Sequence, residues 1–424
     1  MDNFFFEQLR SILGTRYDSF RAAFDGKPRH KALRVNTVKI SVEKFLSEFG
    51  CRALAANPLC SQSFYAAVKP SLDPLYHAGL YYMQEPSASA AVSAFAPYIG
   101  KRVLDLCSAP GGKATQAAAL ADIDILFCND VEPKRLHALA DNVERLGITN
   151  AVITRNTAAD YVRAGFCGWF DTIIIDAPCS GGGMMRYESV PYSREIVAGC
   201  AARQRAILQD AVRLLSRGGH LLYSTCTFAR EENEENIEYL CALGLEPIEI
   251  PLCDGTERGL GVPQARRIYP MNFDGEGHFY CVLEKPRGEL CDKPPQRKKK
   301  CSVEIGGVRL DGEEIFGRAV LPIDLPETEG LNVVRVGVPM LDGRNPSHAL
   351  SHALGTDALE KIGTVELGAL SESYIRGEQL DFDAAHGILA ATVGGYAIGW
   401  VRSAATGDGC GALKNLYPKS LRVR

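Results

Sequence analysis

The sequence predicts an α/β fold built on a doubly wound, mainly parallel β-sheet. From Lys101 onward, short apolar runs of strand character alternate with segments of helical periodicity. Strands separated by helical segments imply crossover connections, and therefore parallel pairing. A glycine-rich loop stands between the first of these strands and the helix after it. Loops of this kind are expected at the carboxyl ends of the strands, near the point where the strand order reverses.

The elements follow this pattern along the chain. Residues 1 to about 30 read as helical, 31–50 as a strand then a helix, and 63–95 as strands leading by a turn into a small-residue helix. Strands are then expected at 102–107, 125–130, 151–156, 171–177 and 220–226, with helices at 113–121 and 132–147 among them. Residues 284–301 are Pro-rich and charged, which favours a linker before a smaller β-rich region. The predicted organisation is an N-terminal α+β region (1–93), a catalytic domain (94–286), a linker (287–302) and a C-terminal region (303–424).

Composition narrows the class of protein. No apolar run approaches the roughly 18 residues that span a bilayer, and the acidic, amphipathic start lacks the order of a secretion signal, so the cytoplasm is expected. The 14 cysteines include no CxxC pair, which argues against a zinc ribbon, and no metal site is expected. A net charge of −4 argues against a non-specific nucleic-acid coat protein. Any nucleic-acid contact should use local basic patches, such as the RKKK run at 297–300, although a solvated linker also explains that run.

The first glycine loop lies in VLDLCSAPGGKATQ, residues 103–116. Gly111 and Gly112 let the backbone approach a ligand, and the helix N-terminus after them favours a carboxylate or phosphate. The loop matches neither GxGxxG nor GxxxxGK[ST], so dinucleotide and nucleoside-triphosphate sites are poorly supported. Asp130, at the end of the next strand, is placed like a ribose-binding acid. A loop for an amino-acid tail together with an acid for a ribose suits S-adenosylmethionine; the alternative is a plain turn and a solvated Asp.

Two cysteines stand at the ends of later strands. Cys179 lies in DAPCSGGGM and Cys226 in LLYSTCTFAREENE. A helix opening near Thr227 would place its positive end beside Cys226, and we expect this to lower the pKa of the thiol and favour the nucleophilic thiolate. Each cysteine alone is more simply a buried structural residue. Together with Asp176 and the glycine loop on one sheet edge, they indicate a catalytic site.

The motifs LDLCSAPGGKA, NDVEPKR, DAPCSGGG and YSTCTFAREENE, in this order, resemble the Sun-type RNA (cytosine-5) methyltransferases. The resemblance runs from about Leu33 to Glu284, and RVNT (34–37) and YMQEPSASA (82–90) are similar to the family's amino-terminal signatures. It implies a Rossmann-like class I methyltransferase fold and S-adenosylmethionine as cofactor. The end of the chain, GCGALKNLYPKSLR, resembles RsmF-like 16S rRNA methyltransferases, which carry a PUA-like RNA-binding domain after the catalytic one.

The resemblance also implies residue roles. Cys226 is the expected nucleophile and Cys179 assists release of the methylated product, while Asp176 holds the cytosine edge and Lys113 lines the site. The implied cofactor-binding positions are Cys107, Ser108, Ala109, Pro110, Gly111, Gly112, Lys113, Asp130, Arg135, Asn156 and Asp176. Asn156 departs from the family, which commonly has an Asp near the adenine. Its amide oxygen still accepts a hydrogen bond from an amino group; Asp160 is the alternative counterpart.

The expected substrate is RNA with a splayed-out cytosine, most plausibly 16S rRNA or the 30S subunit, bound by a monomer. Tyr187, Met184, Met185 and Arg186 are candidates to contact the flipped base, although the methionines equally suit packing beneath the loop. Lys414, Tyr417 and Lys419 are candidate phosphate ligands. The alternatives are a tRNA methyltransferase of the same family, a DNA cytosine methyltransferase, which would share only the Pro-Cys dipeptide, and a non-catalytic RNA-binding assembly factor.

Overall fold

A central mixed sheet organises the molecule. The computed structural model describes residues 3–26, 31–66, 68–186, 190–381, 386–403 and 412–423. The strand order of the central sheet is β11 (Thr256–Arg258), β12 (Arg266–Ile268), β13 (His278–Glu284), β9 (Leu215–Thr225), β8 (Phe170–Asp176), β5 (Arg102–Asp105), β6 (Ile125–Asn129), β7 (Ala151–Thr154) and β17 (Val333–Val336), and β10 (Glu246–Pro247) pairs with β13.

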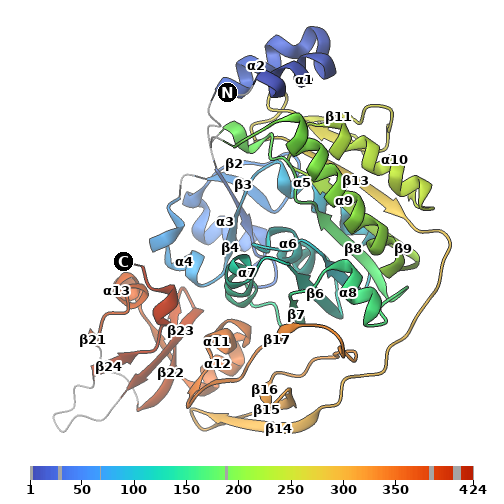
Figure 1. Ribbon diagram of the computed structural model, residues 1–424. Helices are drawn as coiled ribbons and strands as arrows, with labels where there is room; N and C mark the ends of the chain where they lie inside the picture. Colours follow the sequence, from blue (N-terminus) through green and yellow to red (C-terminus); the bar gives the residue numbers. More distant parts are fainter. Residues whose placement is uncertain are drawn as a thin grey trace.

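Strands β5 to β9 confirm the predicted doubly wound sheet (Figure 1). All pairs among them are parallel, whereas β13 and β17 join at the two sides in the antiparallel sense. The chain moves outward from β5 to β7 and then returns to β8 on the other side of β5, so the order reverses between β5 and β8. Ligands of such sheets bind at the carboxyl ends of the strands beside this reversal.

Helices cover both faces of the sheet (Figure 1). One face packs against α5 (Ala88–Phe95), α6 (Gly112–Leu120) and α7 (Pro133–Arg145). The other packs against α8 (Ala158–Arg163), α9 (Arg194–Leu214) and α10 (Glu234–Ala242). Because both faces of β8 are buried, its sequence is a continuous apolar run of isoleucines rather than an alternating one.

The N-terminal region has two parts. Helices α1 (Asn3–Leu13) and α2 (Tyr17–Asp25) share an aromatic core with Phe228 and Tyr269, so they pack against the segment that follows Cys226. An antiparallel sheet follows, in the order β2 (Ala53–Ala56), β3 (Ser63–Ala66), β1 (Lys31–Val35) and β4 (Tyr81–Gln84), with α3 (Val42–Phe49) and α4 (Pro74–His77). The helix, strand and small-residue helix predicted from the sequence are all present.

The C-terminal third is β-rich. Strand β14 (Lys299–Ile305) begins inside the segment predicted as a linker (287–302). It is followed by β15 (Val308–Ile315) and β16 (Arg318–Val320), then β17, β18 (Leu341–Asp342) and β19 (Asn345–Pro346). A further sheet has the order β20 (Thr364–Glu366), β22 (Gly387–Val393), β23 (Tyr396–Ser403), β24 (Ala412–Asn415) and β21 (Leu380–Asp381). The accompanying helices are α11 (His348–Ala353), α12 (Thr356–Ile362) and α13 (Ser371–Arg376).

Short 3₁₀ helices connect these elements. They are η1 (Gly14–Arg16), η2 (Gly50–Arg52), η3 (Pro70–Leu72), η4 (Ala96–Tyr98), η5 (Met184–Arg186), η6 (Arg230–Glu232), η7 (Gly368–Leu370) and η8 (Lys419–Leu421). None of the helices in the described ranges is long and apolar enough to cross a membrane.

The C-terminal third is closely joined to the rest of the chain. Strand β17 extends the central sheet beside β7, and α11 packs against α7 (Figure 1). One hydrophobic cluster contains Leu33 and Phe45 of the N-terminal region together with Leu389 and Val401 of the C-terminal sheet. The two ends of the chain therefore form one core beside the central sheet.

A buried ion pair fixes the segment after Cys226. Both guanidinium nitrogens Nε and Nη2 of Arg267 lie 2.6 Å from the carboxylate oxygens of Glu234, and the two side chains are 2% and 0% exposed. Arg267 also donates to the carbonyl oxygen of Phe228 at 2.9 Å. Removing one partner of a bidentate, fully buried ion pair is costly, because the remaining charge is then neither paired nor hydrated.

Glu234→Gln is therefore expected to lower the free energy of unfolding by about 3–5 kcal/mol, because it leaves Arg267 charged and buried without its partner. The matched control is Glu235→Gln, one residue along the same helix, whose half-exposed carboxylate pairs with Arg205 at 3.1 Å. That control substitution should lower the free energy of unfolding by about 1 kcal/mol or less. Urea denaturation measures both, and equal midpoints for the two variants would contradict this account.

Candidate active site

The two motif cysteines meet at the carboxyl edge of the sheet. Strands β8 and β9 are parallel neighbours, with Asp176 opposite Ser224. The chain therefore leaves both strands side by side, and Cys179 Sγ lies 3.3 Å from Cys226 Sγ. The glycines after Cys179 allow this approach: a Cβ at Gly183 would stand 2.9 Å from the carbonyl oxygens of Cys226 and Glu276.

The expected lowering of the Cys226 pKa is wrong for this state of the protein. No helix opens at Thr227: residues 227–229 are irregular, and α10 begins only at Glu234. The pKa of Cys226 is instead raised well above its usual value, first by the hydrogen bond with Cys179 and then by burial. The negative charges of Asp176 and Glu276 act in the same direction. The thiol is thus held protonated until its surroundings change.

A buried carboxylate holds the two cysteine loops together. Glu232 is 0% exposed and accepts hydrogen bonds from the backbone nitrogen of Ser180 at 3.0 Å and from its hydroxyl at 2.5 Å. The Ser180 hydroxyl lies 2.8 Å from that of Thr227, the residue after Cys226. Glu232 therefore holds Ser180 and, through it, Thr227, the residues that follow the two cysteines. Its position in the EENE run of the sequence did not indicate this role.

Asp176 and Lys113 form an ion pair beside the thiols. Lys113 Nζ lies 2.7 Å from Asp176 Oδ2, and the Ser224 hydroxyl donates to Asp176 Oδ1 at 2.9 Å. Burial opposes ionisation of Asp176, but the charge of Lys113 and these hydrogen bonds outweigh it, and the pKa of Asp176 lies below its usual value. The structure thus brings together the two cysteines, Asp176 and Lys113.

A cavity of about 250 Å³ opens beside this pair. The predicted loop forms one wall with Cys107, Ser108, Ala109, Pro110, Gly112 and Lys113. Gly111, with φ +106°, makes the turn into α6 and does not line the cavity. Strand β4 and the start of α5 form the other wall with Tyr82, Met83, Gln84, Glu85 and Ala88. The N-terminal region therefore closes the candidate cofactor site.

Asp105 is a cavity residue that the sequence reasoning missed. It ends β5, is fully buried, and its Oδ2 has no hydrogen-bond partner within the described part of the chain. Burial, and then the charge of Asp176, raise the pKa of Asp105 to about 7. An acid at a strand end inside the quoted motif was the available signal. An orphan carboxylate oxygen in a cavity is suited to a ligand that carries N–H or O–H groups.

Asp130 and Arg135 lie over the glycine loop. Asp130 is 2% exposed; its Oδ2 accepts from the backbone nitrogen of Ala109 at 3.3 Å and lies 3.3 Å from Arg135 Nη1. Arg135 also donates to the Ala109 carbonyl oxygen. Both predicted residues therefore contact the same loop residue, and their shared role is to hold the loop against the end of β6.

Asn156 is engaged by the C-terminal third. Its Oδ1 accepts from the backbone nitrogen of Asn332 at 2.9 Å, and its Nδ2 donates to the Asn332 carbonyl oxygen at 3.3 Å. These bonds lie just before β17, the strand that joins β7. The alternative residue, Asp160, instead caps α8 through Thr157 and pairs with Arg163.

The candidate RNA-contacting residues separate into two groups. Met185 is buried in the aromatic core of α1 and α2, whereas Met184 is 40% exposed. Arg186 donates to backbone oxygens of Ala23 and Gly26, so it anchors α2. Tyr187 lies outside the described residues.

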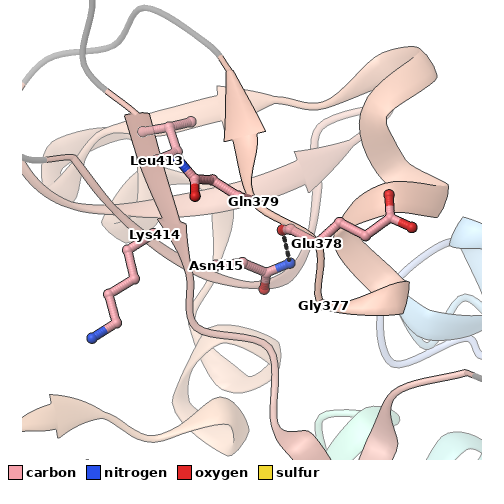
Figure 2. A pocket seen from close by; sticks show the side chains of 6 residues that line it. All are labelled: Gly377, Glu378, Gln379, Leu413, Lys414 and Asn415. Carbon is pink, nitrogen blue, oxygen red and sulfur yellow. Dashed lines mark hydrogen bonds between the residues drawn. The ribbon is translucent and has the colours of Figure 1, made fainter.

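Near the chain end, Tyr417 is also not free to bind phosphate: it is 3% exposed and its hydroxyl lies 2.8 Å from His77 Nδ1. Lys414 and Lys419 are exposed. Lys414 borders a groove of about 340 Å³ formed by residues 377–379 and 413–415, and its ammonium points away from the other labelled side chains (Figure 2). Asn415 closes the groove floor by donating to the Glu378 carbonyl oxygen at 3.0 Å.

Two family models match parts of this chain. Residues 92–284 match the family model described as 16S rRNA methyltransferase RsmB/F, and residues 1–86 match the N-terminal domain of 16S rRNA methyltransferase RsmF. The chain is 34% identical over 307 residues to ribosomal RNA small subunit methyltransferase F of Vibrio vulnificus, covering 66% of this chain and 63% of the relative. The chain thus spans a little under two thirds of that relative's length.

A second relative is covered more fully. The chain is 31% identical over 356 residues to ribosomal RNA small subunit methyltransferase F of Vibrio parahaemolyticus, covering 76% of this chain and 71% of the relative. Among solved structures, NSun6 from Pyrococcus horikoshii with SFG has a TM-score of 0.61 at 21% identity, over 68% of this chain and 99% of that one. This last similarity shows the shared fold.

Cys179→Ala is expected to make Cys226 more reactive towards iodoacetamide at pH 8. The hydrogen bond with Cys179 is the largest cause of the raised Cys226 pKa, so its removal should increase the thiolate fraction, about tenfold for each unit by which the pKa falls. Mass spectrometry of the Cys226 peptide gives the rate, and Cys167→Ala, before the opposite end of β8, serves as control. An unchanged rate would mean that Cys179 does not set this pKa.

Asp105→Asn should alter the pH dependence of stability. Because the folded pKa of about 7 exceeds the unfolded value of about 4, the folded wild type holds a proton that the unfolded chain releases between these values. The wild type should therefore lose unfolding free energy relative to Asp105→Asn as the pH rises from about 4 to about 7, with no further loss above that. Urea titrations across this range measure the difference; the exposed Asp311→Asn should show none.

Proposed function

Because this chain belongs to the ribosomal RNA small subunit methyltransferase F family, we propose that it is an RNA cytosine-C5 methyltransferase that forms 5-methylcytosine in 16S rRNA. The contact of two thiols, Cys179 and Cys226, beside Asp176 is the observation that carries this proposal. Methylation at ring carbon 5 needs a nucleophile that adds and later leaves, and a second group close enough to assist its departure.

We propose S-adenosylmethionine as the methyl donor, since the SFG in the archaeal structure of the same fold is an analogue of this cofactor. When bound, it supplies an electrophilic methyl group on a sulfonium. The residues present fit it: the loop from Cys107 to Gly112 lines a cavity, and the orphan oxygen of Asp105 has room for an N–H donor. Asp130 is proposed for the ribose. Asn156 retains one lone pair on Oδ1 for an adenine amino group, beside its bond from Asn332.

The chain's own residues account for the remaining chemistry. As the Cys226 sulfur adds to cytosine carbon 6, the thiol proton passes to ring nitrogen 3, and this N–H donates to the Asp176 carboxylate. Lys113 keeps that carboxylate ionised. Carbon 5 then takes the methyl group. Loss of the carbon 5 proton to solvent lets the sulfur–carbon bond break. Its electron pair returns to Cys226, which takes back the proton from ring nitrogen 3, and Cys179 assists this release from 3.3 Å away.

We further propose how RNA is held. Regions 1–93 and 303–424 flank the catalytic domain and supply the RNA contacts, the latter as a PUA-like domain. The groove beside Lys414 (Figure 2) and the exposed Lys419 are candidate phosphate contacts. The proposed substrate is 16S rRNA within or before assembly of the 30S subunit, rather than DNA, bound by a monomer in the cytoplasm.

Cys226→Ala is expected to abolish methyl transfer to small-subunit rRNA, because it removes the thiol proposed to add to carbon 6. Cys179→Ala should instead accumulate a covalent protein–RNA adduct, because addition proceeds but release is slowed. Tritium transfer from labelled S-adenosylmethionine and denaturing gels measure the two outcomes, with the exposed Cys241→Ala as control.

An adduct that forms in Cys226→Ala but not in Cys179→Ala would reverse the two assignments. Bisulfite sequencing of rRNA from a deletion strain tests the substrate. If every 16S cytosine kept its methylation state in that strain, the rRNA proposal would be wrong, and tRNA would be examined next.

A further inference from the structure

His278 is a buried histidine that the chemistry above does not use. It begins β13, is 3% exposed, and neither ring nitrogen has a hydrogen-bond partner within the described ranges. Asp176 Oδ1 lies 3.9 Å from its Nε2. Buried polar groups are rarely left unpaired, and exceptions call for an explanation such as a missing ligand.

The sheet places this imidazole beside the reacting groups. The last pair of β13 with β9 is Phe279 opposite Thr225, and His278 and Cys226 each adjoin that pair. Asp176 ends the neighbouring strand, opposite Ser224. His278 therefore stands at the same edge as the attacking thiol and the carboxylate.

The charge state of His278 defines what it can bind. Burial, and then the positive charge of Lys113, lower the pKa of His278 to about 3, so the ring is neutral at neutral pH. A neutral imidazole has one N–H and one lone pair. The Asp176 carboxylate favours the tautomer that turns an Nε2–H toward it, which leaves Nδ1 as an acceptor. An acceptor selects a ligand with an N–H group.

We propose that His278 contacts the target base and accepts a hydrogen bond from the 4-amino group of cytosine, and thereby helps to distinguish cytosine from uracil. Uracil has a carbonyl oxygen at that position, which would face a lone pair. The inference rests on the proposed function. The cofactor's ammonium is the other N–H donor of this chemistry, but its expected place is along the glycine loop, whereas His278, like Cys226, adjoins the last pair of β9 and β13.

The test pairs protein variants with a substrate analogue. A synthetic RNA carries, at the methylated position found by bisulfite sequencing, either cytidine or the 2-pyrimidinone riboside, which lacks the amino group. Methyl-transfer rates on the two RNAs give a preference ratio for each protein. His278→Phe keeps a ring but no acceptor, and is expected to reduce the wild-type ratio by about tenfold. His278→Asn retains an acceptor oxygen and should restore part of the ratio, and the exposed His137→Phe should leave it unchanged.

The outcomes separate the possible roles. Equal loss of rate on both RNAs, with the ratio unchanged, would make His278 structural and overturn the proposal. A weaker dissociation constant for S-adenosylmethionine with an unchanged ratio would assign His278 to the cofactor instead, which also overturns it. If His278→Phe does not fold, the same ratio is read from His278→Gln. A wild type that methylates neither RNA would refute the proposed function, whereas an active wild type with an insensitive ratio refutes only the role of His278.

Discussion

The parallel pairing of β8 with β9 is the constraint on which the site depends. Asp176 stands opposite Ser224, so the two strands end at the same level, and the loops that leave them are side by side. Contact between Cys179 and Cys226 follows from this register rather than from any local preference of either loop. A shift of one residue would turn every side chain of one strand to the opposite face and separate the thiols. The isoleucine-rich interior of β8, packed on both faces, makes such a shift costly.

The charged groups at the carboxyl edge of β8 and β9 set the protonation states of the site without a ligand. Lys113 keeps Asp176 ionised, the hydrogen bond with Cys179 and burial keep Cys226 protonated, and burial raises the pKa of Asp105 to about 7. Bringing a positively charged sulfonium and a flipped base into the cavity would change this balance. A cation beside Cys226 favours its thiolate, and a base between the two thiols would interrupt the hydrogen bond that raises the pKa of Cys226. Under the proposed function, the arrival of ligands would therefore favour formation of the Cys226 thiolate.

Regions outside the catalytic domain complete the site from three directions. Strand β4 supplies one wall of the cavity, α1 and α2 support the segment after Cys226, and the backbone of Asn332 holds Asn156 at the end of β7. The amide at position 156, where the family commonly has an acid, both donates to and accepts from that backbone. A carboxylate has no N–H to donate, so Asn matches this contact better.

The sequence by itself determined the succession of strands and helices along the chain, and it predicted the edge and the two cysteines of the candidate site. These follow from local periodicity, from turn-forming glycines and from motifs that are contiguous in the chain. Only the tertiary structure decided the direction of the Cys226 pKa shift and the burial of Tyr417. It also decided the hydrogen bonds of Glu232 to Ser180 and the lack of hydrogen-bond partners for His278 within the described residues. Each of these depends on groups far apart in sequence, because hydrogen bonding and desolvation are set by what packs around a side chain. The helix expected near Thr227 is the clearest example. In the structure α10 begins only at Glu234, where the buried ion pair with Arg267 lies, and Phe228 packs in the aromatic core before it.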